Sequence, residues 1–417
     1  MSKKVILVGV SGSDKNFEYS MVELYNLAEA NHYEVIDTVK QNMERVHKAT
    51  YVGKGKVEEL KQIAEMLGAN ALVMNDELTA SQIRNLEEAV GLEIIDRTAL
   101  ILAIFAERAK TREAQLQVEI ARLKYELPRL AGGDDKLDQQ SGASGMANRG
   151  SGEKKIESDR RIIKNQIRHL TKELEEIVQE RETRRRKRKK NEIPIVSLVG
   201  YTNAGKSTTM NGLVERFSKS AHKQVFEKDM LFATLETSIR EIILPDKKQF
   251  LLTDTVGFVS KLPTHLVKAF RSTLEEVKEA DLLLHVVDYS DENYQAMIET
   301  TEKTLEAVGV KDVPVLFIYN KADKVAGAEY PVLRDGGLIY SAKDVASLAM
   351  LTEEIKKQIF EDYKELTFLI PFDRGDIISY LNEHARVIMQ DYTEQGTELR
   401  AEVSPVDAER FHAFQMK

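Results

Sequence analysis

The sequence predicts a multidomain α/β protein. A chain of 417 residues is about three times as long as an ordinary domain of roughly 150 residues, so one uniform fold is not expected. Short apolar runs alternate with amphipathic stretches in two separate parts of the chain, which is typical of parallel sheets covered by helices. A long stretch between these parts has apolar residues at helical spacing. We therefore expect four domains, at 1–105, 106–190, 191–363 and 364–417.

The composition indicates a globular protein of the cytoplasm. Hydrophobic residues make up 42% of the chain and charged residues 31%, as in proteins with a charged surface. No apolar run approaches the about 20 residues that cross a bilayer, so we expect no membrane span, and any membrane association would be peripheral. The start, MSKKVILVGV, predicts a strand because no small-residue cleavage site follows it. The absence of Cys excludes disulfides, thiolate chemistry and Cys-based zinc sites.

The net charge of −8 conceals a basic segment in an acidic chain. Residues 106–190 contain 23 Lys and Arg against 15 Asp and Glu, whereas the remainder has a net charge of −16. The run 181–190 (RETRRRKRKK) includes eight basic residues. Eight like charges repel one another unless an anion lies nearby, which favours a polyanionic partner. The alternatives are a solvated linker and a helix end, whose last turn favours cations.

The first domain, 1–105, is predicted to be a small α/β domain with a parallel sheet. The expected strands are 4–9, 35–39, 71–74 and 92–95, and the expected helices are 17–31, 56–67 and 81–90. Thr79 and Gln82 have the spacing of a capping box at the start of the third helix. The sequence GKGK at 53–56 lacks the spacing of a phosphate-binding loop, so we interpret it as a turn before a helix and not as a second nucleotide site.

A long antiparallel helical hairpin is predicted for 106–190. One helix is expected across 98–127, where no Gly or Pro occurs, and Pro128 ends it because proline has no N–H. A second helix is expected from about Glu153. Apolar residues recur at spacings of four and three in both helices, namely Leu116, Ile120, Leu123 and Leu127, and then Ile163, Ile167, Leu170, Leu174 and Ile177. Two such faces are best buried against each other, in arms on the order of 40 Å long.

The loop between the two helices, 131–152, contains six Gly and three Ser. This composition cannot bury a core, so we expect a mobile loop that becomes ordered on a partner. The loop is also longer than the 2–8 residues that usually join two helices. It is therefore interpreted as part of an RNA-binding element, the alternative being a passive connector.

A phosphate-binding loop is predicted at the start of the third domain. The apolar run IPIVSLVG leads into Gly200-x-x-x-x-Gly205-Lys206-Ser207, and a helical stretch, 208–217, follows. The glycines let backbone N–H groups close around phosphates, and a helix N-terminus favours the same charge. Lys206 would contact the β- and γ-phosphates, and Ser207 would bind Mg²⁺. A chance Gly-rich turn would not account for the flanking strand and helix.

Three further motifs predict that the nucleotide is GTP. The sequences DTVG (254–257), NKAD (320–323) and SAK (341–343) follow in order, each after an apolar run. The carboxylate of Asp323 can accept from both N1–H and the 2-amino group of guanine, whereas adenine would leave it unpaired. Each motif alone occurs by chance, but three in order at the carboxyl ends of strands predict a Ras-like P-loop GTPase domain.

These motifs resemble those of the HflX family, in the Obg–HflX group of translation-associated P-loop GTPases. GYTNAGKST, LFATLETS, DTVGF and NKAD resemble its nucleotide motifs, and YVGKGKVEEL, NDELTASQIRNLEE and GEKKIESDRR resemble its N-terminal region. The resemblance covers nearly the whole chain. It implies a GTPase that binds the large ribosomal subunit and its rRNA, separates stalled or idle ribosomes, and hydrolyses GTP to GDP and phosphate. We expect it to act as a monomer.

The resemblance also implies the roles of individual residues. Lys206, Thr234 and Gly257 would be catalytic, with the Gly257 amide sensing the γ-phosphate. Ser207 and Thr234 would bind Mg²⁺ directly, and Asp254 would hold it through water. The residues placed at the nucleotide are Gly200, Tyr201, Thr202, Asn203, Ala204, Gly205, Lys206, Ser207, Thr208, Phe232, Ala233, Thr234, Leu235, Glu236, Asp254, Thr255, Val256, Gly257, Asn320, Lys321, Ala322, Asp323, Ser341, Ala342 and Lys343.

Two side chains bear on the rate of hydrolysis. Phe258 follows Gly257, at the position where many small GTPases have a Gln that orients water. We therefore expect the isolated protein to hydrolyse GTP slowly. The alternative role for Phe258 is core packing. Asn203 lies where potassium-activated GTPases use an Asn oxygen, which suggests K⁺ as a cofactor beside GTP, GDP and Mg²⁺. The alternative is that Asn203 only fills the loop.

The last domain, 364–417, is predicted to be a small α+β domain. We expect a strand at LTFLIP, a helix over 376–390 and strands around 400–403. Two rival functions share some of these sequence features. A GTP-gated RNA or ribosome assembly factor without splitting activity remains an alternative. A tRNA-modifying GTPase is excluded because enzymes of that kind use a C-terminal Cys, and this chain has none.

Overall fold

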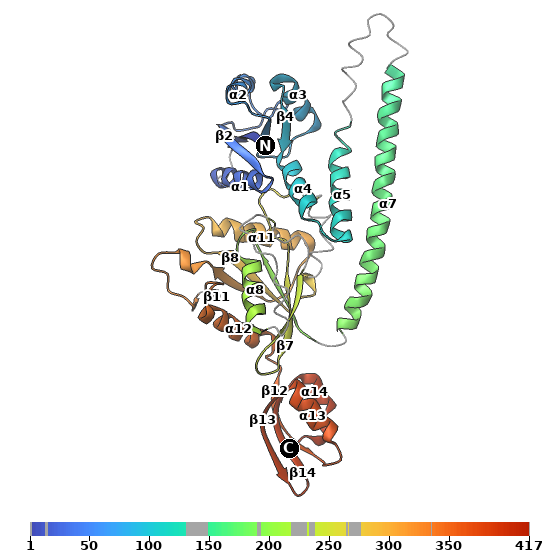
Figure 1. Cartoon of the computed structure of the whole chain (residues 1–417), viewed down its shortest axis with the longest axis vertical. Coiled ribbons are helices and arrows are strands. Elements are labelled where there is room, and N and C mark those ends of the chain that lie inside the picture. Colours follow the sequence, from blue (N-terminus) through green and yellow to red (C-terminus); the bar gives the residue numbers. More distant parts are fainter. Residues whose placement is uncertain are drawn as a thin grey trace, which may run out of the picture. The chain divides into compact units, whose positions relative to one another are not determined.

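The computed structural model confirms the multidomain α/β fold class (Figure 1). It describes residues 2–12, 16–130, 149–189, 193–217, 232, 238–263, 266, 277–334 and 336–416, and for 149–156 and 181–189 it describes only the helical backbone. The chain forms two compact units. The first comprises Met1–Arg186, Lys228–Glu236 and Gly257–Thr273, and the second comprises Lys187–Glu227, Thr237–Val256 and Leu274–Lys417. The division into four domains stays a prediction.

The first unit begins with a four-stranded parallel sheet in the order β2-β1-β3-β4. The strands are β1 (Lys3–Val10), β2 (Tyr33–Gln41), β3 (Ala71–Met74) and β4 (Glu93–Asp96), and the helices between them are α1 (Phe17–Ala30), α2 (Lys54–Leu67) and α3 (Ala80–Val90). Side chains such as Ile6, Leu60 and Leu72 are fully buried in a shared core. The sequence predicted all of these elements, with small differences at their ends.

One local prediction in this part is confirmed and one is corrected. Thr79 and Gln82 form the capping box, since the Thr79 hydroxyl accepts from the Gln82 N–H and the Gln82 side chain accepts from the Thr79 N–H. The GKGK sequence is the start of α2 and not a turn before it, because Gly53 is the N-cap and the helix begins at Lys54.

The single helix expected across 98–127 is wrong, because the chain forms α4 (Arg97–Arg108) and α5 (Arg112–Glu126) instead. Ala109 leaves the helix with an extended backbone, and the Thr111 hydroxyl accepts from the Ala114 N–H as the N-cap of α5. The absence of Gly and Pro permits a continuous helix but does not require one, and a Thr cap can start a new helix within such a stretch.

The helical hairpin has arms of unequal length. The α5 helix has 15 residues and α7 (Arg149–Lys189) has 41, which correspond to about 22 Å and about 60 Å. Arg112 in α5 donates two hydrogen bonds to Glu173 in α7, at 2.6 and 2.8 Å, and the two helices lie beside each other in Figure 1.

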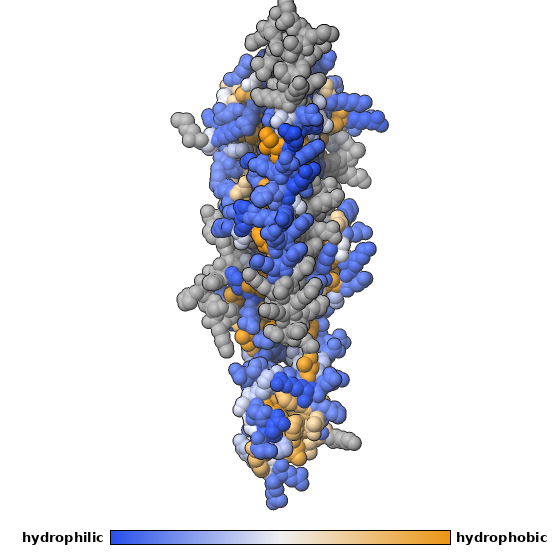
Figure 2. Space-filling view, turned by 90° about the vertical axis from the view of Figure 1, so that its right-hand side faces the viewer, coloured by the Kyte–Doolittle hydropathy of each residue, from blue (hydrophilic) through white to orange (hydrophobic). Residues whose placement is uncertain are grey.

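The apolar face predicted for α7 is only partly buried. Its residues Ile163, Ile167, Leu170, Leu174 and Ile177 are all half-buried. Figure 2, viewed from the side of α7, shows a surface there that is mostly hydrophilic. The loop residues 131–148 and the side chains of the basic run 181–190 lie outside the described residues, so their interpretation stays a prediction. Nowhere in the described ranges is there a helix both long and apolar enough to cross a membrane.

The second unit contains a seven-stranded sheet in the order β10-β11-β9-β8-β5-β7-β6. The strands are β5 (Ile195–Gly200), β6 (Ser238–Ile243), β7 (Gln249–Asp254), β8 (Leu282–Asp288), β9 (Val315–Asn320), β10 (Val332–Arg334) and β11 (Gly337–Ile339), and the helices are α8 (Lys206–Phe217), α11 (Tyr294–Val308) and α12 (Val345–Ile359). The five central strands are parallel and the two edge strands are antiparallel. The carboxyl ends of the parallel strands therefore meet at one edge of the sheet.

The C-terminal part is a three-stranded antiparallel sheet in the order β12-β14-β13 with short helices. Its elements are β12 (Lys364–Ile370), α13 (Gly375–His384), β13 (Arg386–Thr393), β14 (Gly396–Val403) and α14 (Pro405–Arg410). The helix predicted over 376–390 is wrong beyond His384. The chain becomes extended at Ala385, and Val387 and the residues after it pair with β14. The β-branched Val387 and Ile388 favour a strand.

Candidate nucleotide-binding site

The loop between β5 and α8 has backbone positions that only glycine can occupy without strain. Gly200 has φ +143°, and a Cβ there would lie 2.2 Å from the Val286 carbonyl oxygen. Gly205 has φ +98°, and its Cβ would lie 2.0 Å from Nδ2 of Asn320. The two glycines thus let the loop pack directly against β8 and the end of β9. The loop joins a buried strand to a helix N-terminus, which is the geometry that binds phosphate groups.

Lys206, the first residue of α8, is enclosed by this loop. Its side chain is 6% exposed, and Nζ donates to the carbonyl oxygens of Gly200 at 3.0 Å and Tyr201 at 2.7 Å. Burial lowers the pKa of Lys206 from its ordinary value to about 8, although the nearby Asp254 carboxylate opposes this change. An anion in the loop would favour the charged ammonium and raise the pKa again.

Ser207 and Asp254 bring two oxygen ligands together beside Lys206. The Ser207 hydroxyl donates to Oδ2 of Asp254 at 2.8 Å, and Asp254 is fully buried at the end of β7. Hydroxyl and carboxylate oxygens are the hard donors that Mg²⁺ prefers. The donor set of these two residues therefore fits a magnesium ion.

Asn320 joins the phosphate-binding loop to the third motif. Its Nδ2 donates to the Ala204 carbonyl oxygen at 2.8 Å, and its Oδ1 accepts from the Ala342 N–H at 2.9 Å. The side chain is buried, with 3% exposed. A single amide thus fixes the relative positions of the GYTNAGKS and SAK segments.

Asp323 and Lys321 are held by polar neighbours. The hydroxyl of Ser341 donates to Oδ1 of Asp323 at 2.7 Å. Asp323 is an exposed residue. Lys321 donates to Oδ2 of Asp288 at 2.6 Å. The carboxylate of Asp323 is therefore oriented from one side and accessible from the other, as recognition of a base edge requires.

Four chain segments that the sequence placed at the site are brought together in the second unit. Residues 200–208, 254–256 and 320–323, together with 341–343, surround the carboxyl edge of the sheet. Asn203 is exposed with φ +60°. Residues 233–236, including Thr234, lie outside the described residues, and Phe232 and Gly257 belong to the first unit.

The sequence missed two residues near this edge. Asp288, which holds Lys321, ends the apolar run LLLHVVD, and this is the same signal that identified Asp254. His285 is 2% exposed on β8, and burial, together with the charge of Lys206, lowers its pKa to about 4. A lone His inside an apolar run gives no signal of a neighbouring phosphate loop. Its imidazole is neutral at physiological pH.

Three family models match the chain. One described as "GTP-binding GTPase N-terminal" matches residues 18–106, one described as "GTP-binding GTPase Middle Region" matches 108–188, and one described as "50S ribosome-binding GTPase" matches 195–321. The GTPase HflX of Caldanaerobacter subterraneus is 43% identical over 412 residues, which are 99% of this chain and 94% of that protein. The chain belongs to the HflX family.

A second relative supports the assignment to the HflX family. The GTPase HflX of Escherichia coli is 35% identical over 92% of this chain and 89% of that protein. Among solved structures, a GTP-binding protein from Sulfolobus solfataricus in complex with GDP is 26% identical, covers 87% of this chain and 99% of its own, and gives a TM-score of 0.44. As a member of the HflX family, the chain is a GTPase and binds guanine nucleotides, and the sequence-based prediction of the family is confirmed.

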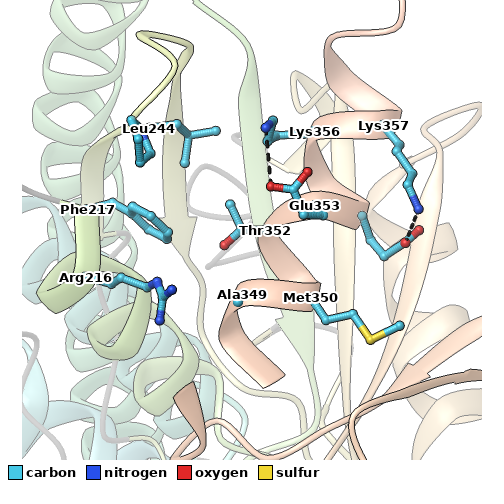
Figure 3. Close-up of a pocket in the computed structure, with 11 residues that line it drawn as sticks. Arg216, Phe217, Leu244, Ala349, Met350, Thr352, Glu353, Lys356 and Lys357 are labelled. Atoms are coloured by element: carbon cyan, nitrogen blue, oxygen red, sulfur yellow. Dashed lines mark hydrogen bonds and ion pairs between the residues drawn. The ribbon is translucent and has the colours of Figure 1, made fainter. Parts of the chain in front are cut away.

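The chain also has a surface pocket away from the nucleotide motifs. It has a volume of about 430 Å³ and lies between the C-terminal end of α8, the turn after β6 and α12 (Figure 3). Phe217, Leu244 and Met350 contribute apolar surface, while Glu353 and Lys356 form an ion pair at its side. The phosphate-binding loop lies at the opposite, N-terminal end of α8, so this pocket is no part of the nucleotide site.

Proposed function

We propose that this HflX-family GTPase binds the large ribosomal subunit and dissociates stalled or idle ribosomes in a cycle of GTP binding and hydrolysis. The observation that carries the proposal is the match of residues 195–321 to the model described as "50S ribosome-binding GTPase". It occurs in a chain that covers 94% of a GTPase HflX. The protein would act as a monomer in the cytoplasm.

The roles proposed for individual residues at the nucleotide are supported by the enclosed position of Lys206 and by the contact of Ser207 with Asp254. Lys206 would offset the charge of the β- and γ-phosphates, while Ser207 and Thr234 would hold Mg²⁺ and Asp254 would hold the ion through water. A magnesium ion held there would supply stabilisation of the charge that develops on the phosphate oxygens. The Gly257 amide binds the γ-phosphate, and the Asp323 carboxylate accepts from guanine.

Hydrolysis by the protein alone would be slow. Phe258 is 2% exposed, which supports core packing as its role, and a phenyl ring cannot orient water by hydrogen bonding. Ordering of the site would then depend on the ribosome. Asn203, whose backbone lies in the left-handed region at an exposed position, would contribute a side-chain oxygen to K⁺ beside the phosphates.

The helical hairpin would contact rRNA. The α7 helix extends for 41 residues, and the segment 106–190 carries a net positive charge in an otherwise acidic chain. Basic helices bind the phosphate backbone of RNA through charge, and Gly-rich loops can become ordered in an RNA cavity. The hairpin therefore supplies affinity for the ribosome, and its loop would act at the site of subunit separation.

Sedimentation of intact ribosomes with the protein and a non-hydrolysable GTP analogue tests this proposal. Splitting predicts that the ribosome peak is replaced by peaks of separate subunits, with the protein on the large one. The alternative, a GTP-gated binding or assembly factor, predicts that the protein co-sediments with intact ribosomes. Intact ribosomes at saturating protein would contradict the splitting function.

A further inference from the structure

Lys321 turns the chain from β9 towards Asp323, the residue proposed to accept from guanine. It directly follows the strand and directly precedes the 3₁₀ helix Ala322–Lys324, which contains Asp323. The backbone of Lys321 lies in the left-handed region, with φ +65°. A lysine seldom adopts this conformation unless its surroundings hold it there. The position of Asp323 therefore depends on the contacts that fix Lys321.

Asp288 fixes the side chain of Lys321. The Lys321 ammonium donates to Oδ2 of Asp288 at 2.6 Å, and 15% and 16% of the two side chains are exposed. The other carboxylate oxygen, Oδ1, accepts from the backbone N–H of Ser290 at 3.1 Å and from its hydroxyl at 2.6 Å. Both oxygens of Asp288 are thus engaged, so the carboxylate holds Lys321 in a fixed orientation.

The main chain brings the two partners to the same corner of the sheet. Asp288 ends β8 and lies beside Asn320, the last residue of the parallel neighbour β9. The N–H of Tyr289 donates to the carbonyl oxygen of Asn320 at 2.8 Å, which continues this pairing beyond the strands. The ion pair of Asp288 and Lys321 therefore lies at the carboxyl edge of the sheet, where open α/β sheets bind their ligands.

The turn after β9 is also held from the opposite side. The N–H of Ala322 donates to the carbonyl oxygen of Tyr340 at 3.2 Å, and the hydroxyl of Ser341 donates to Oδ1 of Asp323 at 2.7 Å. Tyr340 and Ser341 directly follow β11, which is the other neighbour of β9 in the sheet. The turn is thus fixed from β11 by Ser341 and from β8 by Asp288.

The charge of Lys321 reaches the phosphate-binding loop. Burial lowers the pKa of Lys206, the Asp254 carboxylate opposes this change, and the positive charge of Lys321 adds to it. The ammonium groups of Lys206 and Lys321 are therefore close enough to repel each other. A carboxylate at position 288 offsets this repulsion, whereas a neutral acceptor there would hold Lys321 less firmly.

We propose that Asp288 is a positioning residue for guanine recognition, which acts through Lys321 on the carboxylate of Asp323. The ion pair fixes the turn at Lys321 before the nucleotide binds, so the base does not have to provide the free energy for ordering this turn. The contact favours a purine that has hydrogen-bond donors at both N1 and the 2-amino position. The inference rests on the guanine role proposed for Asp323, and it is independent of ribosome binding.

The test compares the affinities of the full chain for GDP and for inosine diphosphate, whose base lacks the 2-amino group. The parent chain should prefer GDP, because Asp323 can accept two hydrogen bonds from guanine and only one from hypoxanthine. Asp288→Asn keeps the shape of the side chain but leaves one acceptor oxygen for the donors of Ser290 and Lys321. We expect the preference for GDP to fall about fivefold in this variant. Retained binding of inosine diphosphate shows that the variant is folded.

The ratio of the two affinities separates positioning of the base site from two other effects. A Lys321 side chain released from Asp288 would bring its charge to the phosphates, and a general loosening of the fold would weaken binding of both nucleotides. Both effects change the two affinities alike and cancel in the ratio. The double variant Asp288→Asn/Lys321→Met should show the same GDP preference as Lys321→Met alone, because Asp288 has no cation to hold once Lys321 is replaced.

Asp281→Asn is the matched control. Asp281 directly precedes β8, at the opposite edge of the sheet from Asp288, and its Oδ2 accepts from the Ile195 N–H at 2.7 Å. Its GDP preference should equal that of the parent chain.

An unchanged GDP preference in Asp288→Asn overturns the inference, and so does a further loss of preference in the double variant relative to Lys321→Met. A parent chain that binds both nucleotides equally would overturn the guanine role of Asp323 as well. None of these results bears on ribosome splitting, which the sedimentation profile tests separately.

Discussion

The side-chain amide of Asn320 donates to the carbonyl oxygen of Ala204 at 2.8 Å. This hydrogen bond connects the end of β9 to the phosphate-binding loop, and Oδ1 of the same amide accepts from Ala342. The two motifs that flank a bound nucleotide are therefore not independent loops. A substitution that disturbs one of these loops is therefore expected to disturb the other.

Asn320→Ala should lower the free energy of unfolding by about 2–4 kcal/mol, because it leaves two buried backbone groups without a partner. Urea denaturation of the variant and the parent chain measures this difference. Asn382→Ala is the control, since it removes an exposed amide that donates to Ile378, and its effect should stay within about 0.5 kcal/mol. Equal effects of the two substitutions would show that Asn320 does not join the loops.

Asp323→Asn should reverse the base preference. The new amide donates where guanine also donates, so GTP affinity should fall on the order of 100-fold through the loss of two charge-assisted hydrogen bonds. Xanthosine triphosphate, which has an acceptor at that edge, should bind better to the variant than to the parent. Competition binding with both nucleotides measures the change. A variant that keeps its guanine preference would show that the NKAD motif is assigned wrongly.

Nucleotide affinity should depend on pH through Lys206. Its pKa before binding is lowered to about 8, and phosphate groups raise it. Below pH 8 the Lys206 side chain is already charged, so nucleotide affinity should not change with pH. Above pH 8 binding must take up a proton, so affinity should fall by up to about tenfold per pH unit. Titrations with GDP between pH 7 and pH 9 measure the slope.

Lys206→Arg is the control for this pH dependence. Arg stays charged over the whole range, so the variant should bind more weakly because of its shape but show no decline between pH 8 and pH 9. The same decline in both proteins would assign the titration to another group.

Binding to ribosomes should weaken steeply as salt concentration rises, because charged contacts to RNA release counterions. Neutralising Arg184, Arg185, Arg186 and Lys187 should reduce the slope of log affinity against log salt concentration, by on the order of one for each lost phosphate contact. Binding measured at several salt concentrations gives the slope. If the slope does not change, the basic run is a solvated linker.

The elements that could be predicted from the sequence are those set by local pattern. The β3 strand coincides with the apolar run 71–74, and the α2 and α3 helices differ from prediction by at most two residues at their starts. The P-loop spacing likewise identified the residues that surround Lys206, because a backbone that encloses phosphate needs glycine at fixed positions. Local chemistry was sufficient in each of these cases.

The errors and omissions have two other causes. At the Thr111 cap and at the β-branched Val387 and Ile388, a local signal for a new element competed with the helical pattern, and the helical pattern was followed wrongly. The contact of Ser260 with Glu23 joins residues 237 positions apart, and no spacing rule relates them. Asp288 could have been identified, since it ends an apolar strand at the same edge as Asp254, but its pairing with Lys321 could not.

The rate of GTP hydrolysis with purified ribosomal subunits tests the central claim most directly. The account predicts slow turnover by the protein alone, marked stimulation by the large subunit and none by the small subunit. Lys206→Ala, which lacks the phosphate-binding charge, should show no turnover under any of these conditions. Equal rates with and without the large subunit, or an active Lys206→Ala variant, would contradict a ribosome-dependent GTPase that works through this site.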